Sequence, residues 1–326
     1  MRVAIIGCGD VGSTVAYTLM QRGDVDEVML FNRKYEKALG TAIDLNHASA
    51  FHRGIIFTPH SIDDVKLCCQ AGVIVITVGV GLNQYASRRT DLIGDNSKIF
   101  MEILSNLKSC KNSIILVITN PVDNMTYMAY NYLKTWGIGN NQIIGLGTAV
   151  ESARYRSHLA KRLGCMPSDL RNSAIVLGEH GDSMVLVSSL IGQKEFRRDS
   201  KIIKSIVSGG AYFIRKTLRS GPKYSIALCA NDIISSIVDE KRWGKSLFTV
   251  SSYIDRNDYY GLRDISISLP TYIGKKGIEY IKDINLNKSE NAALLRSAKI
   301  VKNNLEALKL SLQCEKEKLD SICELC

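Results

Sequence analysis

Apolar runs and amphipathic stretches alternate along the first half of the chain. Short apolar runs lie at 3–6, 28–31, 55–57, 73–78, 113–119 and 142–145, and each has the length and composition of a buried strand. Between several of them, apolar residues recur at helical spacing over 11–19, 35–50 and 92–107. Strands that alternate with helices predict an α/β fold built on a doubly wound parallel sheet.

The second half of the chain has a different order of elements. Helices are predicted over 151–163, 202–218, 226–238 and 289–312, and short strands over 173–177, 246–254 and 265–269, the last two as an antiparallel pair. We therefore predict a doubly wound domain over 1–145, a mixed α+β domain over 146–312, and a charged helical tail over 313–326.

Charge and hydropathy narrow the class of protein. The formal net charge is +10, but no basic run is interleaved with aromatic residues. This pattern favours small anionic ligands and argues against nucleic acid. The longest apolar runs are too short to span a membrane, and a strand begins almost at once, which leaves no room for a secretion signal. We therefore expect a cytoplasmic protein that binds neither nucleic acid nor membrane.

Nine cysteines are scattered along the chain. In a cytoplasmic protein they are expected to be reduced thiols. Cys323 and Cys326 have C-x-x-C spacing, which can bind metal or carry redox chemistry. Because no second such pair accompanies them, we expect this pair to be inert and the chain to hold no metal.

A glycine-rich turn follows the first predicted strand. Gly7, Gly9 and Gly12 form the pattern G-x-G-x-x-G, with Asp10 and Val11 inside it, directly between a strand and a helix. The first glycine allows a tight turn, the second lets the backbone approach a pyrophosphate, and the third lets the helix pack on the strand. In this context the motif predicts a dinucleotide-binding Rossmann domain.

The end of the second strand departs from the usual dinucleotide pattern. Asn32 stands twenty positions after Gly12, where an acidic residue would bind the ribose hydroxyls of NAD. Asn32 can still hydrogen-bond a hydroxyl but does not repel a 2′-phosphate, and Arg33 could pair with one or could be an ordinary surface charge. We favour NAD as the cofactor and leave NADP open.

One histidine stands among small and polar residues at a predicted strand end. His180 lies between Gly178 and Gly181, where a substrate could approach it closely. Glu151 and Arg154 are three residues apart on one predicted helix face. They could orient a histidine and bind a carboxylate. A structural histidine and a surface salt bridge are the alternatives.

Polar residues gather where the parallel strands end. Gly79 and Asn120 follow two buried strands, and the segment from Gly79 to Arg89 is polar with glycines at its base. Ligands of doubly wound sheets bind beyond the carboxyl ends of the strands. We expect this segment to be a hinged lid over a site, with an ordinary surface loop as the alternative.

Four blocks of residues in this order resemble the L-lactate/malate dehydrogenase superfamily, nearest its L-lactate and L-2-hydroxyacid branch. The blocks are 7–12, 119–123, 151–156 and 178–183. The resemblance extends over nearly the whole chain, from Gly7 to about Leu308. It implies an enzyme that uses NAD, or NADP, on a small 2-keto or 2-hydroxy acid and that forms a homodimer or homotetramer.

The resemblance also implies roles for individual residues. His180 matches the catalytic proton donor and acceptor, and Glu151 takes the position of the carboxylate that orients it. Arg154 matches the arginine that binds the substrate carboxylate. Arg89 matches the lid arginine that polarises the carbonyl, and Asn120 matches the asparagine that contacts substrate and nicotinamide. Glu151 stands where the family has aspartate, and this departure puts the rate in doubt.

The substrate is less clearly implied. Malate enzymes of this superfamily carry a second arginine in the lid, about six residues before the catalytic one. Counting back from Arg89 gives Asn83 or Gln84, neutral amides that favour pyruvate or a longer 2-keto acid over oxaloacetate. Arg88 keeps malate possible. The non-enzymatic alternative is an inactive dinucleotide-binding scaffold, which the departures at Asn32 and Glu151 would allow.

Overall fold

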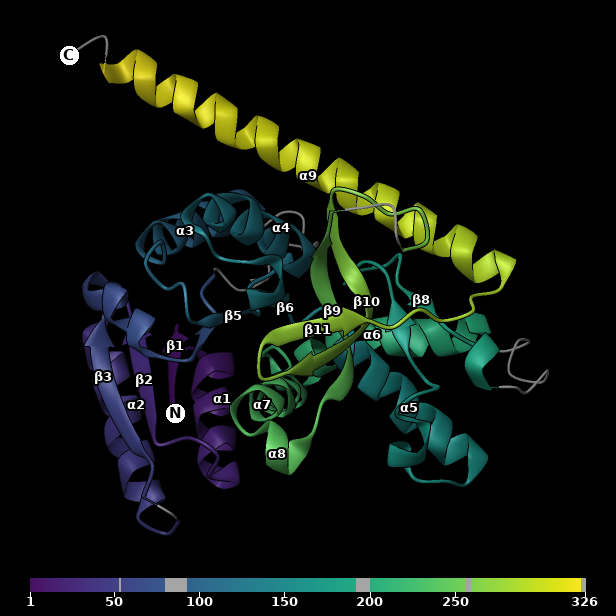
Figure 1. The fold of residues 1–326 in the computed structure, drawn as a ribbon, viewed down its shortest axis with the longest axis horizontal. Helices are drawn as coiled ribbons and strands as arrows, with labels where there is room; N and C mark the ends of the chain where they lie inside the picture. Colours follow the sequence, from purple (N-terminus) through teal and green to yellow (C-terminus); the bar gives the residue numbers. More distant parts are fainter. Residues whose placement is uncertain (53, 80–92, 192–199, 256–258, 324–326) are drawn as a thin grey trace.

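The structure is a computed structural model that describes residues 1–52, 54–79, 93–191, 200–255 and 259–323. A nine-stranded sheet forms its centre, in the order β11-β10-β9-β6-β5-β4-β1-β2-β3 (Figure 1). The six parallel strands are β1 (Arg2–Ile6), β2 (Glu27–Asn32), β3 (Ile56–Ser61), β4 (Val73–Ile76), β5 (Ile114–Val117) and β6 (Ile143–Gly145). The predicted α/β fold with a Rossmann domain is thereby confirmed.

Helices cover both faces of the parallel part of the sheet. They are α1 (Asp10–Arg22), α2 (Tyr35–Ser49), α3 (Ile93–Asn106) and α4 (Val122–Leu133), with the 3₁₀ helices η1 (Ile62–Gln70), η3 (Lys134–Trp136) and η4 (Asn140–Gln142). Along β1, Val3 and Ile5 pack into the core on the side of α1 and α2, whereas Ala4 and Ile6 pack on the side of α3 and α4. Because successive strand residues point to opposite faces, a continuous apolar strand is what a doubly covered sheet requires.

The second half adds antiparallel strands and helices. Its elements are α5 (Ala149–Leu163), η5 (Pro167–Leu170), β7 (Val176–Leu177), β8 (Val185–Leu186), η6 (Ser189–Ile191), α6 (Ser200–Leu218), α7 (Tyr224–Val238), α8 (Glu240–Trp243), β9 (Ser246–Ile254), β10 (Ile265–Gly274), β11 (Gly277–Ile281) and α9 (Lys288–Cys323). The strands β9 and β10 pair antiparallel, as predicted.

The two halves share one sheet. The strands β6 and β9 meet antiparallel at the pair Gly145 and Ser251. A Cβ on Gly145 would lie 2.2 Å from the hydroxyl oxygen of Thr126, so only glycine fits at this junction. The parallel sheet therefore continues without a break into the second half.

Some predicted elements differ from those observed. The strand expected over 173–177 is only β7, because Ser173 and Ala174 instead bond back to Leu170 in a turn. The tail continues the helix α9, whose C-terminal end extends past α3 (Figure 1). Cys326 lies outside the described residues. Among the described helices, none is both long and apolar enough to cross a bilayer.

The cysteines depart from the expectation of reduced thiols throughout. Cys69, at the end of η1, and Cys110, after α3, are joined by a disulfide. Cys8, Cys68, Cys165 and Cys229 are free thiols. The prediction was wrong for Cys69 and Cys110 because spacing along the chain does not reveal which thiols the fold brings together.

Candidate active site

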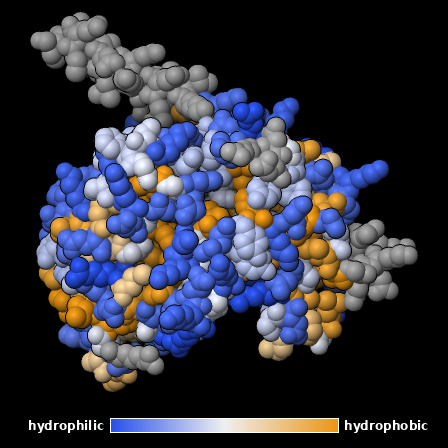
Figure 2. Space-filling view, in the orientation of Figure 1, coloured by the Kyte–Doolittle hydropathy of each residue, from blue (hydrophilic) through white to orange (hydrophobic). Residues whose placement is uncertain are grey.

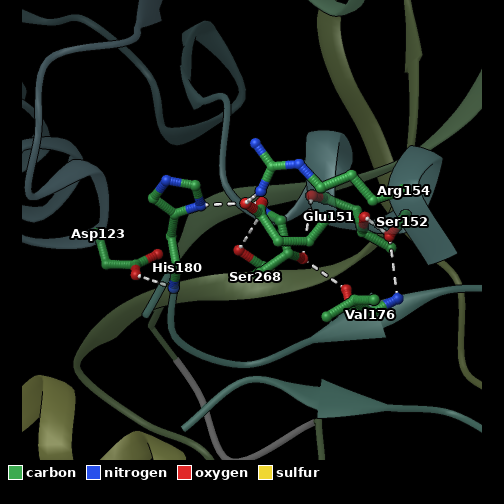
Figure 3. Close-up of polar contacts among 9 residues, drawn as sticks. Asp123, Glu151, Ser152, Arg154, Val176, His180 and Ser268 are labelled. Carbon is green, nitrogen blue, oxygen red and sulfur yellow. Dashed lines mark hydrogen bonds and ion pairs between the residues drawn. The ribbon is translucent and has the colours of Figure 1, made fainter. Parts of the chain in front are cut away.

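His180 is held by its backbone as well as by its side chain. The chain leaves β7 through Gly178, whose φ of 90° is in the left-handed region. A Cβ there would lie 2.6 Å from the hydroxyl oxygen of Ser297. The His180 N–H then donates to a carboxylate oxygen of Asp123 at 2.8 Å (Figure 3). These contacts therefore fix the position of the His180 backbone, from which the imidazole projects.

One buried carboxylate contacts both the histidine and an arginine. The Nδ1 of His180 lies 3.0 Å from Oε2 of Glu151, and Nη1 of Arg154 donates to Oε1 of the same carboxylate at 2.8 Å (Figure 3). The Glu151 side chain is only 1% exposed. The pair Glu151 and Arg154 is therefore a buried ion pair rather than the surface salt bridge that was the alternative.

Hydrogen bonds between elements hold this arrangement in place. On α5, the Ser152 hydroxyl accepts from the backbone N–H of Val176 at 2.9 Å and lies 2.7 Å from the Thr249 hydroxyl on β9. The backbone N–H of Thr148 donates to the Ser268 hydroxyl on β10 at 3.1 Å. The helix that carries Glu151 is thus tied to the strand that leads to His180.

Asp123 is an unusual carboxyl group at this site. It is 3% exposed at the start of α4. Burial raises its pKa to about 6, although the hydrogen bond from the His180 N–H lowers it. Asp123 lies in the block 119–123, but no role was predicted for it, because a contact to a distant backbone N–H leaves no trace in the sequence.

His180, Glu151 and Arg154 line one cavity of about 310 Å³. Val11, Gly79 and Asn120, which were predicted on other grounds, line it too. Arg215 of α6 and Arg219, the residue after this helix, also line it and were not predicted. A helix was predicted over 202–218, but its sequence does not indicate which of its residues would line a site.

The glycine-rich turn has the geometry that its motif predicts. Gly7 has a φ of 109°, and a Cβ on Gly12 would lie 1.9 Å from the carbonyl oxygen of Gly7. A Cβ on Gly9 would meet nothing within 4 Å. Gly12 is therefore needed for helix packing, and Gly9 leaves open space where a pyrophosphate can approach. Asp10 and Val11 begin α1.

Asn32 is more constrained than the sequence suggested. Its Oδ1 accepts from the backbone N–H of Cys8 at 3.1 Å, and its Nδ2 donates to the carbonyl of Lys34 at 3.0 Å. The side chain thus links β2 to the glycine turn. Arg33 is exposed at the same strand end. Burial raises the pKa of the Cys8 thiol to about 11, which leaves it neutral in the turn.

The ends of β4 and β5 bring three polar groups together. The Asn96 amide donates to the carbonyl of Asn120 at 2.9 Å, and a Cβ on Gly79 would lie 2.9 Å from Oδ1 of Asn96. Among the described residues, Oδ1 of Asn120 is buried and has no hydrogen-bond partner. An orphaned acceptor in the cavity suits an amide or hydroxyl donor of a bound nicotinamide nucleotide.

The predicted lid lies outside the described residues. This applies to Asn83, Gln84 and Arg89, so the structure places none of them. The described wall of the site therefore includes the ends of β4 and β5, the turn around His180, and residues of the helices α1, α5, α6 and α7.

Comparison with known families agrees with this geometry. Residues 1–145 match the NAD binding domain of lactate/malate dehydrogenase, and residues 148–310 match the alpha/beta C-terminal domain of the same family. The chain belongs to the lactate/malate dehydrogenase family. Members are NAD-dependent oxidoreductases that act on hydroxy acids, and this chain is one of them, with NAD as its cofactor.

Individual relatives are similar over almost their whole length. The L-lactate dehydrogenase of Acetivibrio thermocellus is 33% identical, and the alignment covers 94% of this chain and 97% of the relative. Among solved structures, a lactate dehydrogenase from a deep-sea metagenome library superposes with a TM-score of 0.83 at 30% identity, over 94% of this chain and 98% of its own. The malate dehydrogenase of Cryptosporidium parvum gives the same TM-score at 29% identity, with the same two shares.

Proposed function

We propose that this dehydrogenase interconverts L-2-hydroxy acids and 2-keto acids, with pyruvate and L-lactate as its first substrate pair. The main support is Glu151, which contacts His180 and Arg154 in the same cavity that Gly79 and Asn120 line. A proton-exchanging group and a carboxylate-binding group are thereby set side by side. L-lactate dehydrogenases among the similar proteins support the choice of pyruvate.

Each polar side chain of the site has a separate role in the proposed reaction. Gly79 and Asn120 would hold the nicotinamide in this cavity, where it would supply or accept the hydride at carbon 2 of the substrate. His180 uses Nδ1 to contact Glu151, so its Nε2 is the atom that gives a proton to the carbonyl oxygen or takes it back. Arg154 keeps N–H groups beyond the one bound to Glu151, and these bind the substrate carboxylate. Asn120 binds the nucleotide and substrate through its buried Oδ1.

The lid completes the site in this proposal. Arg89 polarises the substrate carbonyl when the lid closes and excludes water. Asn83 and Gln84 are neutral, which favours pyruvate or a longer 2-keto acid over oxaloacetate. The malate dehydrogenase among the similar structures and the positions of Arg215 and Arg219 in the cavity lining keep L-malate as the second candidate.

The residues at the end of β2 bear on the choice between NAD and NADP. NAD is the cofactor, but Asn32 contributes no negative charge beside the ribose, and Arg33 is exposed next to it. We propose that discrimination against NADP is weak, because no carboxylate of β2 repels a 2′-phosphate there. Comparing kcat/KM for NADH and NADPH measures this, and a preference for NADH above about a hundredfold would contradict it.

We also propose that the enzyme is a cytoplasmic homo-oligomer. Large apolar side chains are exposed on α6 and α7, including Tyr212, Phe213, Tyr224 and Leu228, each more than half exposed. Apolar patches also interrupt the polar surface on the face shown in Figure 2. A second copy covering such side chains would gain from their burial. Sedimentation velocity decides between a dimer, a tetramer and a monomer.

The function is tested by following NADH oxidation with pyruvate, oxaloacetate, 2-ketoisocaproate and phenylpyruvate. We expect pyruvate or a longer 2-keto acid to have a higher kcat/KM than oxaloacetate. The variant His180→Asn should lose about a thousandfold in kcat, because no proton can be exchanged at that position, while its affinity for NADH changes little. Cofactor binding without turnover of any of the four acids would instead support the inactive scaffold.

A further inference from the structure

Three cysteines lie close together at the edge of the sheet opposite the active site. Cys68 and Cys69 lie near the end of η1, just before β4, and Cys110 lies between α3 and β5. Their three sulfur atoms are all within 4.8 Å of one another. The cluster therefore lies where β4 and β5 begin, whereas the active-site cavity is lined by residues that follow the ends of these two strands.

The spacing of these sulfur atoms suits a metal ion. Thiolates bound to one tetrahedral zinc, with Zn–S distances of about 2.3 Å, lie about 3.8 Å from one another. An oxygen ligand of the same ion would lie about 3.5 Å from each sulfur. The hydroxyl of Ser109, an exposed residue, lies 3.4 Å from the sulfur of Cys69. It is therefore suitably placed to be the fourth ligand beside three thiolates.

Hydrogen bonds hold the two cysteine-bearing segments together independently of the sulfur atoms. The Ser113 hydroxyl donates to the carbonyl of Ala71 at 2.7 Å. The N–H of Ile114 donates to the carbonyl of Gly72 at 2.9 Å. Both contacts join the chain after η1 to the chain at the start of β5. The three thiols therefore remain neighbours when the disulfide among them is opened.

The cellular compartment decides which form the cluster takes. In the cytoplasm, the location proposed above, thiols are kept reduced, and closely spaced cysteines more often bind metal than form disulfides. A cellular dithiol opens the bond between Cys69 and Cys110, giving two thiols and leaving the dithiol oxidised to its own disulfide. Cys68 is already a free thiol. All three sulfur ligands are then available, and Cys69 is the partly exposed one through which an ion enters.

We propose that Cys68, Cys69 and Cys110, once reduced, form a binding site for one zinc ion. Three thiols release three protons as the ion binds three thiolates, and no electron is transferred in this step. Thiolates also suit monovalent copper. A divalent ion offsets more of their charge, which matters because Cys68 and Cys110 are buried in an apolar core.

The role of this site is structural and goes beyond the proposed reaction. The ion links the segment before β4 to the segment before β5, at the edge of the sheet opposite the hydride transfer. The expectation that the chain holds no metal considered only the C-x-x-C pair at 323 and 326. The cluster was missed because Cys69 and Cys110 are 41 positions apart, a separation that matches no metal-binding spacing.

The test measures metal binding by the full chain in its reduced and oxidised forms. A trialkylphosphine opens the disulfide without adding a competing thiol and is itself converted to the phosphine oxide. Zn²⁺ is titrated in competition with a chromophoric chelator, and Co²⁺ replaces it as a visible probe of thiolate ligands. We expect the reduced chain to bind one ion at the cluster with a Kd below about 1 μM and to unfold at a higher temperature when zinc is bound.

The deciding variant is Cys68→Ala, which removes one ligand and leaves the disulfide pair in place. Its reduced form should bind zinc at least about a hundredfold more weakly, and a thermal melt of its oxidised form checks that it folds. Cys165→Ser changes a free thiol outside the cluster and should bind as wild type does. The double variant Cys323→Ser, Cys326→Ser should also keep full affinity.

Three results would overturn this site. One is reduced wild type that binds no zinc in the micromolar range. Another is an unchanged affinity in Cys68→Ala. A third is loss of binding in the double variant, which would assign the ion to the tail. These measurements do not depend on enzymatic activity, so they stand apart from the test of the proposed function. We expect kcat to be the same with and without bound zinc, and a kcat that follows zinc occupancy would contradict the structural role.

Discussion

Glu151 is one methylene longer than the aspartate that the family places here, and it contacts two side chains, His180 and Arg154. The contacts to His180 and Arg154, at 3.0 and 2.8 Å, go to different carboxylate oxygens. The glutamate at position 151, which put the rate of the reaction in doubt, therefore keeps its contact to His180. In the proposed mechanism, Glu151 therefore also links the substrate-binding Arg154 to the proton-exchanging His180.

Removing the charge of Glu151 should be far worse than shortening its side chain. We expect Glu151→Gln to lower kcat by about a hundredfold or more, because the amide cannot stabilise the imidazolium that forms at His180. Glu151→Asp keeps the charge and should retain activity within about tenfold of wild type. Steady-state kinetics with pyruvate measures both, and equal losses in the two variants would contradict this account.

Two adjacent glycines in α6 allow a controlled test of substrate binding. A Cβ on Gly210 would lie 3.2 Å from Cδ and 3.3 Å from Nε of Arg154, whereas a Cβ on Gly209 would lie 3.7 Å from Phe213. We expect Gly210→Ala to raise KM for pyruvate about three- to tenfold by shifting the guanidinium. Gly209→Ala should leave KM unchanged.

Thermal melts of the two variants provide the control for folding. Alanine is the better helix former in both places, by up to about 1 kcal/mol. Gly210→Ala should therefore be at least as stable as wild type while it binds substrate less well. A raised KM in Gly209→Ala as well would mean that the effect belongs to the helix and not to Arg154.

At the scale of the element, α4 contributes a buried acid to the active site. Asp123 has a pKa of about 6 in the folded chain against an ordinary value of 3.8. As the pH rises, the unfolded chain loses this proton first. The group therefore lowers the free energy of unfolding between about pH 4 and pH 6, by on the order of 3 kcal/mol once both states are ionised.

Asp123→Asn should lack this pH dependence. Any hydrogen bond that the amide loses shifts its stability by a constant amount at all pH values. The difference in unfolding free energy between the variant and wild type should therefore move in favour of the variant by about 2–3 kcal/mol from pH 4 to pH 7. Urea unfolding at the two pH values measures it, and a constant difference would contradict the raised pKa.

The elements show where sequence patterns were informative. The parallel strands could be predicted from the sequence because both faces of their sheet are buried. Such strands are continuous apolar runs, as Val73–Ile76 is. The helix α4 was not predicted, because nine of its twelve residues are buried and such a helix has no polar face to reveal its period. The strand β7 was predicted too long, because Ala174 and Ile175, directly before it, are also apolar and buried.

At the scale of the whole molecule, the sequence motifs identified several residues that line the active-site cavity, but they did not identify all of its lining residues. The spacing of Glu151 and Arg154 predicted a shared helix face, and Glu151 contacts both Arg154 and His180. The contribution of α6 to the cavity depends on a long-range docking against α5, which no local pattern encodes. Arg215 could therefore be found only in the folded chain.

The junction between β6 and β9 determines what each half could do alone. Cutting the chain after Gly145 would leave β6 as the last strand of the parallel sheet, with the backbone groups that now face Ser251 exposed. A bare, apolar sheet edge of this kind recruits other strands. The matched NAD domain, expressed as residues 1–145, should therefore form larger assemblies than the full chain does, as light scattering at equal concentration would reveal. In the full chain, β9 pairs with β6 and so protects the edge of the parallel sheet from pairing with other chains.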